Sequence, residues 1–192
     1  MRFNREDERI LLKINDIVLY GAEGVCKIKD ITKENFGEGI MEYYVLQPIY
    51  KDSLMIFVHT GNDHLISKMR RVLSREEIEK IILTMPEEEL LSIEDESERE
   101  IKYQEIINSG DRRAVVKLIK TIYLRQKNRK EQKKNPYAID ERFLKEAEKL
   151  LYDEFALVLN VKPNQVLPLI IKQIEYSKRR KANVCSRRLY NA

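Results

Sequence analysis

The feature that most constrains this chain is a change in the spacing of its apolar residues near residues 69–73. Before this point the chain has short runs rich in β-branched and aromatic residues, which are typical of strands: DIVLY (16–20), GVCKIKDI (24–31), MEYYVLQPIY (41–50) and SLMIFVHT (53–60). After it, apolar residues recur every three to four positions, as in amphipathic helices. The sequence therefore predicts a segregated α+β fold, in which a bent antiparallel sheet or small barrel precedes an all-α helical bundle.

Local signals divide the second part of the chain into helices. Ser74 and Glu77 have the spacing of a capping box, in which each side chain caps the other residue's backbone N–H. Pro86 ends that helix, and we expect a second helix over 92–108, closed by Gly110. Asp111 is expected to cap a third helix that ends before the proline at 136.

Two further helices are expected toward the C-terminus. Asp140 is expected to start a long helix with apolar residues at three- to four-residue spacing. Pro163 suits the first turn of a last helix to about Ile174, within which Pro168 predicts a kink or an earlier end. We therefore expect three regions: a sheet module at 1–70, a helical domain at 71–175 and a basic tail at 176–192, which is expected to be flexible, with a final helix as the alternative.

The stretch GAEG at 21–24 raises the question of a phosphate-binding loop. Such a loop leads directly into a helix, whose N–H groups hold the anion. Here the residues after Gly24 follow a strand pattern, and Glu23 would repel a phosphate. We therefore predict a tight turn between two strands, with Asp16, Tyr20 and Gly24 as its structural residues.

Charge is sorted into blocks along the chain, although the formal net charge is only +4. Residues 86–100 carry eight acidic side chains and one basic one. Residues 112–134 carry ten basic side chains and one acidic one, and residues 176–192 carry six basic side chains and no acid. This segregation favours a polyanion as the partner of the basic parts.

The sequence offers little material for catalysis or metal binding. Its histidines, His59 and His64, and its cysteines, Cys26 and Cys185, have no ligand spacing, and no Ser/His/Asp order or nucleotide loop is present. We expect no enzymatic activity, no cofactor and no metal. No apolar run approaches the roughly 18 residues of a membrane span. The polar N-terminus predicts no signal peptide, and the cysteine pattern favours the cytoplasm.

Several stretches together resemble a known family. INDIVLYGAEGVCKIKDI (14–31), EYYVLQPIY (42–50) and MRRVLSREEIEKII (69–82) are similar to the CarD/CdnL family of bacterial RNA polymerase-binding transcription regulators. KLIKTIYLRQKNRK (117–130) and EKLLYDEFALVLN (148–160) resemble its helical part, in the version typical of clostridia-like bacteria. The chain departs from the family's opening pattern at Asn15, where relatives have Gly, and at Gly21, where they have Pro. It matches that pattern at Asp16, Val18, Tyr20, Gly24 and Val25.

The resemblance implies a Tudor-like or SH3-like sheet module that docks on the β subunit of RNA polymerase, partly by adding an edge strand. It implies a helical domain that contacts promoter DNA, through the backbone and the minor groove, at the upstream edge of the melted bubble. Such a protein would modulate the stability of the open complex. We expect a cytoplasmic monomer that joins the nucleoid through polymerase, and the resemblance leaves activation or repression open.

The alternating strand at 54–59 is the candidate for the polymerase contact. Met55, Phe57 and His59 are expected to lie on the opposite face from Leu54, Ile56 and Val58. The resemblance implies that Met55, Phe57 and His59 contact polymerase. Relatives often carry an arginine near the position of Phe57. The alternative is that Met55 and Phe57 pack under the helical domain.

The basic block is the candidate for DNA contact. On a helical wheel Arg113, Lys117, Lys120 and Lys127 fall within about 80° of one another, and the alternative is a solvated face. Relatives place a wedge tryptophan near Ser92 or Glu96, but this chain has no Trp, so Leu90, Leu91 or Ile93 is the candidate replacement. The residues that we expect to bind DNA are Arg99, Lys102, Arg112, Arg113, Lys117, Lys120, Arg125 and Lys127.

Two other non-enzymatic functions stay open on the sequence alone. One is an adaptor that binds polymerase without touching DNA, which the missing tryptophan favours. The other is an RNA-binding protein with an SH3-like barrel. RNA binders usually interleave exposed aromatic residues with bases, whereas Tyr123 lies near the apolar side of its helix and Tyr137 is isolated.

Overall fold

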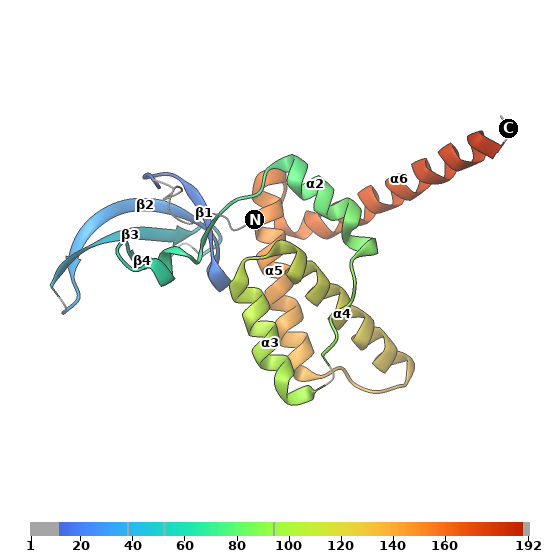
Figure 1. Ribbon diagram of the computed structural model, residues 1–192, viewed down its shortest axis with the longest axis horizontal. Helices are drawn as coiled ribbons and strands as arrows, with labels where there is room; N and C mark the ends of the chain where they lie inside the picture. Colours follow the sequence, from blue (N-terminus) through green and yellow to red (C-terminus); the bar gives the residue numbers. More distant parts are fainter. Residues whose placement is uncertain (1–11, 38, 52, 94, 190–192) are drawn as a thin grey trace, which may run out of the picture.

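The computed structural model describes residues 12–37, 39–51, 53–93 and 95–189. A strongly curved antiparallel sheet forms one end of the molecule and a group of helices forms the other (Figure 1). The segregated α+β layout predicted from the apolar spacing is therefore confirmed. None of the helices in the described part of the chain is long and apolar enough to cross a membrane.

The sheet has five strands in the order β4-β3-β2-β1-β5. A register shift between Ile28 and Asp30 inserts an extra residue into β2, and such a bulge bends the strand and increases its twist. The short strand β5 pairs with β1, and the apolar spacing does not predict it, because it falls at the expected boundary between the modules. The strands are β1 (Ile17–Tyr20), β2 (Gly24–Asn35), β3 (Ile40–Pro48), β4 (Ile56–His59) and β5 (Met69–Arg71).

The GAEG stretch turns the chain between β1 and β2. A single 3-10 turn, η1 (Gly21–Glu23), leads into a strand and not into a helix. Gly21 and Gly24 have φ values of 45° and 80°, which only glycine adopts without strain. The conformation is that of a tight turn and lacks the helix N-terminus that a phosphate loop requires.

The helices follow the sheet in chain order, except for one short helix between β4 and β5. Helix α5 is central, because α4, α6, α2 and α3 all pack against it. The helices are α1 (Asp63–Ile66), α2 (Arg75–Thr84), η2 (Met85–Glu87), α3 (Glu96–Ser109), α4 (Arg112–Glu131), α5 (Ala138–Leu159) and α6 (Pro163–Leu189).

Several expected helix ends are confirmed. The Ser74 hydroxyl accepts a hydrogen bond from the Glu77 N–H, and the Glu77 carboxylate accepts one from the Ser74 N–H, so the capping box is present. Gly110 ends α3 in the left-handed conformation. The Asp111 carboxylate caps α4 by accepting hydrogen bonds from Arg113 and from the following residue.

Three expected helix boundaries are wrong. Helix α5 begins at Ala138, two residues before Asp140, which lies in its first turn. Helix α3 begins at Glu96 instead of 92, because Asp95 caps it and Ile93 is drawn into the core of the helical domain. Helix α6 continues through Pro168 to Leu189, well past the expected end at Ile174. The proline removes one backbone donor, but Ile170 and Ile174 beyond it still pack against the bundle and hold the helix together.

Two apolar cores lie on opposite faces of the sheet. The smaller one is enclosed by the curved sheet and includes Cys26, Ile28 and Val58. The larger one lies among the helices, and it also takes in Leu19 from β1 and Val25 from β2. Because strand residues contribute to the helical core, the two modules share buried apolar contacts.

Candidate functional site

The outer end of the sheet carries four aromatic side chains in contact, which we call the aromatic cluster: Phe36, Tyr43, Phe57 and His59. The ring centroid of Phe36 lies 5.1 Å from that of Tyr43 and 5.3 Å from that of Phe57. Tyr43 lies 5.4 Å from His59. Phe36 is 62% exposed and Phe57 is 42% exposed, so the cluster presents aromatic surface to solvent.

The aromatic cluster continues a sheet face whose other end is buried. Tyr43 pairs with His59 across β3 and β4. Side chains two or four positions apart on a strand lie on the same face, so Gln47 shares the face of Tyr43. Gln47 pairs with Lys27 on β2, and Val25, two residues before Lys27, therefore lies on this face as well. Val25 packs into the helical core. The helical domain therefore covers one end of this face and leaves the aromatic end open.

The structure places the three residues assigned to polymerase on the exposed side of an edge strand. Met55 is 49% exposed just before β4, and Phe57 belongs to the aromatic cluster, so neither packs under the helical domain as the alternative required. Val58 is fully buried, which confirms the predicted alternation. Strand β4 lies at the edge of the sheet, where backbone N–H and C=O groups face away from β3.

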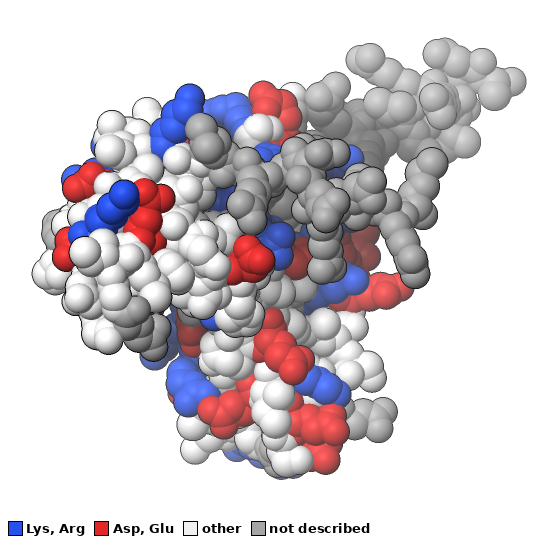
Figure 2. Space-filling model, turned by 60° about the vertical axis from the view of Figure 1, so that its left-hand side comes forward, with Lys and Arg blue, Asp and Glu red and all other residues white. Residues whose placement is uncertain are grey.

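The sheet end has a larger uncharged surface than the helical domain. Figure 2 shows the sheet end as mostly white with a few basic and acidic side chains, whereas the helical domain below it carries more basic and acidic side chains side by side. In α3 such a neighbouring pair is Lys102 and Glu98, whose charged atoms are 2.5 Å apart. The two ends of the molecule therefore present surfaces of different chemistry.

Five of the basic residues expected to bind DNA make hydrogen bonds or ion pairs within the chain, and Lys102, which pairs with Glu98, is one of them. Lys120 donates hydrogen bonds to the backbone carbonyls of Pro86 and Glu88, at 2.8 and 2.5 Å. Lys117 lies 3.7 Å from the Glu88 carboxylate. These contacts hold an extended segment across the flank of α4, so part of the helical face that the wheel assigned to solvent is covered. Arg112 and Arg125 make buried ion pairs, described below.

The other predicted residues differ in their surroundings. The guanidinium of Arg99 lies 5.1 Å from the centre of the Tyr137 ring. Arg113 and Lys127 are exposed, with no ion-pair partner among the residues that the structure describes. Of the three candidate wedge residues, Leu90 is half exposed, whereas Leu91 and Ile93 pack against the helical core.

A further group of lysines lies at the far end of α4 and in the loop that follows. We call Lys127, Lys130, Lys133 and Lys134 the basic tip. All four are exposed, with only Glu131 as an acid among them. Arg129 orders this loop by donating to the Asn135 carbonyl at 2.7 Å and stacking 3.8 Å from the Tyr137 ring centre. The run KNRKEQKK at 127–134 was the signal for this group, but only Lys127 was assigned from the sequence.

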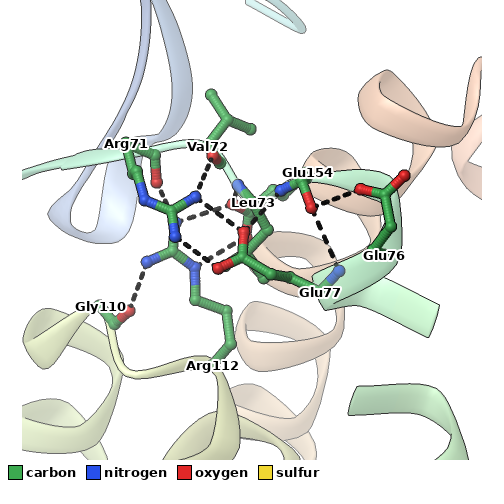
Figure 3. A network of polar contacts seen from close by, with 9 residues as sticks. Arg71, Val72, Leu73, Glu76, Glu77, Gly110, Arg112 and Glu154 are labelled. Atoms are coloured by element: carbon green, nitrogen blue, oxygen red, sulfur yellow. Dashed lines mark hydrogen bonds and ion pairs between the residues drawn. The ribbon is translucent and has the colours of Figure 1, made fainter. Parts of the chain in front are cut away.

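Arg112 and Glu154 form the polar centre of the junction between the two modules (Figure 3). Arg112 donates to both carboxylate oxygens of Glu154, at 2.9 and 2.7 Å. It also donates to the carbonyls of Arg71 in β5 and Gly110 before α4, at 2.8 and 2.9 Å. Glu154 is 1% exposed and accepts a further hydrogen bond from the Leu73 N–H. One side chain therefore ties α4, α5 and the strand-to-helix linker together.

A second buried ion pair lies inside the helical domain. Arg125 donates to the Tyr103 hydroxyl at 2.7 Å and lies 3.4 Å from a carboxylate oxygen of Asp140. Asp140 is fully buried in the first turn of α5, and Tyr103 also donates to it. The pair joins α3, α4 and α5, which gives Arg125 a structural contact that its place in the basic block did not indicate.

Of the three turn residues assigned from the sequence, only Gly24 lies against the helical domain. Asp16 accepts a hydrogen bond from the Lys13 N–H at 2.8 Å, just before β1. Tyr20 packs partly buried against the core of the sheet. A Cβ atom at Gly24 would lie 3.8 Å from the Leu150 side chain, and its φ of 80° makes any larger residue strained.

The described residues supply no arrangement typical of a catalytic or metal centre. Among them, no group of three histidine, cysteine, aspartate or glutamate side chains is placed to hold a metal ion. Burial, with a smaller contribution from the charge of Glu23, raises the pKa of the Cys26 thiol to about 12. This thiol therefore stays protonated at neutral pH and is no nucleophile.

Comparison with protein families assigns both modules. The family model described as the CarD-like/TRCF RID domain matches residues 12–73, and the model described as the CarD C-terminal domain matches residues 80–171. The chain belongs to the CarD-like family. Members of this family are transcription regulators that interact with RNA polymerase and are not enzymes. A search of curated proteins gave no match.

Proposed function

We propose that this CarD-like protein docks on the β subunit of RNA polymerase through its sheet module and contacts promoter DNA through its helical domain, thereby modulating the stability of the open complex. It would act as a cytoplasmic monomer that polymerase brings to the nucleoid. The observation that carries the proposal is the exposed aromatic cluster beside the edge strand β4, in the module that matches the family's RID domain.

The proposed polymerase contact combines a strand edge with aromatic surface. A partner strand added to β4 would use the backbone groups that face away from β3. Such a strand would bring its side chains next to Met55 and Phe57, which are both about half exposed. Buried aromatic residues dominate the energy of many protein interfaces. Because the aromatic cluster carries no fixed charge, we expect this association to depend only weakly on salt.

The proposed DNA contact lies on the basic tip and on Arg113. Their exposed cations would neutralise backbone phosphates, which positions a protein on DNA without reading its sequence. Lys102 and Arg99 are secondary candidates, and Leu90 is the exposed apolar side chain that could enter the minor groove. Arg112, Lys117, Lys120 and Arg125 have internal contacts that favour a structural role.

A second candidate function is an adaptor that binds polymerase without touching DNA. It is favoured by the use of Lys120 and Arg112 within the chain. It is also favoured by the acidic start of α3, where Asp95 and Glu98 would repel phosphates. The adaptor shares the polymerase contact and differs only at the helical domain.

Two measurements test the proposal and separate it from the adaptor. Pull-down of core polymerase is expected with the wild-type chain and not with Phe57→Asp, which places a negative charge in the aromatic cluster. The lifetime of the open complex on a promoter is expected to change with wild type and to return toward the protein-free value with Lys130→Gln/Lys133→Gln/Lys134→Gln. Polymerase binding without any change in lifetime would favour the adaptor, and no polymerase binding would reject both functions.

A further inference from the structure

Helix α6 extends well beyond the core that it helps to form. Its first half packs against α2 and α5. Ile170 is buried, and Ile174 is the last of the described side chains of the helix to pack against the helical core. The helix continues to Leu189, which at 1.5 Å per residue is about 22 Å past Ile174. Figure 1 shows this second half leaving the bundle on the side away from the sheet.

The composition of this second half is strongly biased. It contains no acidic residue from Tyr176 onward and includes four consecutive basic residues. The segment lies outside the family match, which ends at 171. The basic residues are Lys178, Arg179, Arg180, Lys181, Arg187 and Arg188, and we call the segment 178–188 the basic arm.

The composition of the basic arm restricts what can bind it. A helix that binds in a membrane surface needs a continuous apolar face, but the arm offers only Val184 and Cys185 as larger apolar side chains. Adjacent like charges repel one another, and this repulsion is relieved by a partner with closely spaced negative charges. The phosphate backbone of duplex DNA provides such a series, at one charge per about 1.7 Å of helix axis.

We propose that the basic arm is a second DNA contact, which binds the phosphate backbone without sequence preference and acts in addition to the basic tip. The inference rests on the proposed function for the choice of DNA as the polyanion. Because the arm follows Ile174, the last of the described side chains of α6 in the helical core, its contribution to DNA binding can be tested separately from the stability of the fold.

The test uses the full-length chain and a labelled duplex DNA of random sequence. The variant Lys178→Gln/Arg179→Gln/Arg180→Gln/Lys181→Gln keeps the length and helical propensity of the arm. Its affinity is expected to fall by at least tenfold at low salt. The slope of log K against log salt is expected to flatten by about 0.9 for each phosphate that the variant no longer neutralises. The melting temperature should stay at the wild-type value, since Lys178 and Arg179 are exposed and the substitutions begin after Ile174, where α6 packs against the helical core.

A chain that ends after Ser177 and the basic-tip variant Lys130→Gln/Lys133→Gln/Lys134→Gln complete the design. The truncated chain also lacks Arg187 and Arg188, so it should bind at least as weakly as the four-residue variant, and each should bind more weakly than wild type. An unchanged affinity and slope in the arm variants, with weaker binding in the tip variant, would overturn the basic arm but not the proposed function. If the wild-type chain does not bind DNA at all, both the basic arm as a DNA contact and the DNA contact in the proposed function are rejected. Tighter binding of the arm to RNA of the same length would overturn its assignment to DNA.

Discussion

Arg112 donates two hydrogen bonds to the Glu154 carboxylate across the junction between the sheet module and the helical domain. The side chain of Arg112 is 13% exposed and that of Glu154 is 1% exposed, so the pair is almost completely removed from water. Arg112 also donates to two backbone carbonyls, which are otherwise difficult to satisfy at this position. One guanidinium group therefore links α4 to α5 and to β5 at the junction, in addition to the apolar contacts of Leu19 and Val25.

Removing the charge of Glu154 should destabilise the protein strongly. The substitution Glu154→Gln leaves the Arg112 cation buried beside a neutral group, and breaking a buried pair in this way typically costs about 3–5 kcal/mol. Unfolding in urea, followed by circular dichroism, measures the change in free energy. The matched control is Glu100→Gln, which removes an exposed ion pair to Arg142 and should cost less than about 1 kcal/mol. Equal costs for the two variants would contradict the role of the junction.

The same substitution should loosen the geometry between the modules. Spin labels at Lys33→Cys in β2 and Asn128→Cys in α4, in a Cys185→Ser background, report the distance between two exposed positions on different modules. The distance distribution from pulsed electron paramagnetic resonance should be narrow in wild type and wider with Glu154→Gln. An unchanged width would mean that the apolar contacts of Leu19 and Val25 are sufficient to fix the junction.

Acid should weaken the start of α2 through Glu77. Hydrogen bonds from Arg71 and then from the Ser74 N–H lower the pKa of Glu77 to about 2, from an ordinary value of 4.5. Because the pKa is lowered by folding, the stabilisation is fully present above about pH 5 and is lost as the pH falls from 4.5 toward 2. The difference in unfolding free energy between wild type and Glu77→Gln should therefore shrink over this range. A difference that is constant from pH 6 to pH 2.5 would contradict the assignment.

The aromatic cluster should carry the polymerase contact with little help from charge. Phe57→Ala should weaken binding to core polymerase by at least tenfold, because central aromatic residues dominate such interfaces. The affinity of wild type should change by less than threefold between 0.1 and 0.4 M salt, measured by surface plasmon resonance. The control is Ile101→Ala on α3, which removes a similarly exposed apolar side chain from the other module. Equal effects of Phe57→Ala and Ile101→Ala would argue against the cluster.

Substitutions in the basic tip and on the flank of α4 should have different effects on DNA binding and on stability. Lys127→Gln/Lys130→Gln should flatten the salt dependence of DNA binding by about two units and leave the melting temperature unchanged. Lys120→Gln should leave the salt dependence of DNA binding unchanged. It should lower the melting temperature, because the carbonyls of Pro86 and Glu88 lose their donor. If Lys120→Gln leaves the melting temperature unchanged, Lys120 has no structural role and is again a candidate for phosphate contact.

The sequence predicted those features that are determined by neighbouring residues. The capping box of Ser74 and Glu77, the αL end at Gly110 and the cap at Asp111 each involve side chains and backbone groups within four residues. The alternation around Val58 is equally local. Such features follow from backbone geometry and hydrogen bonding alone, and the structure has all of them.

Features that depend on distant partners could not be predicted in this way. Arg112 finds Glu154 and Arg125 finds Asp140 only after the helices have packed, across 42 and 15 residues of sequence. A helical wheel gives the face of a residue but not the segment that covers it, so it does not predict the contacts of Lys120. The three-residue strand β5 is too short to show a period, and it exists because β1 offers it an edge.

The shared core between the modules has a thermodynamic consequence for binding. With Leu19 and Val25 buried among the helices and Arg112 fixing the linker, the aromatic cluster and the basic tip are held at a set separation. In the proposed complex, docking of the sheet would confine the tip to a small volume next to the promoter, where its effective concentration is of the order of millimolar. Lysines that bind free DNA only weakly would then be close to saturation on polymerase, which would restrict the action of this protein to promoters that polymerase already occupies.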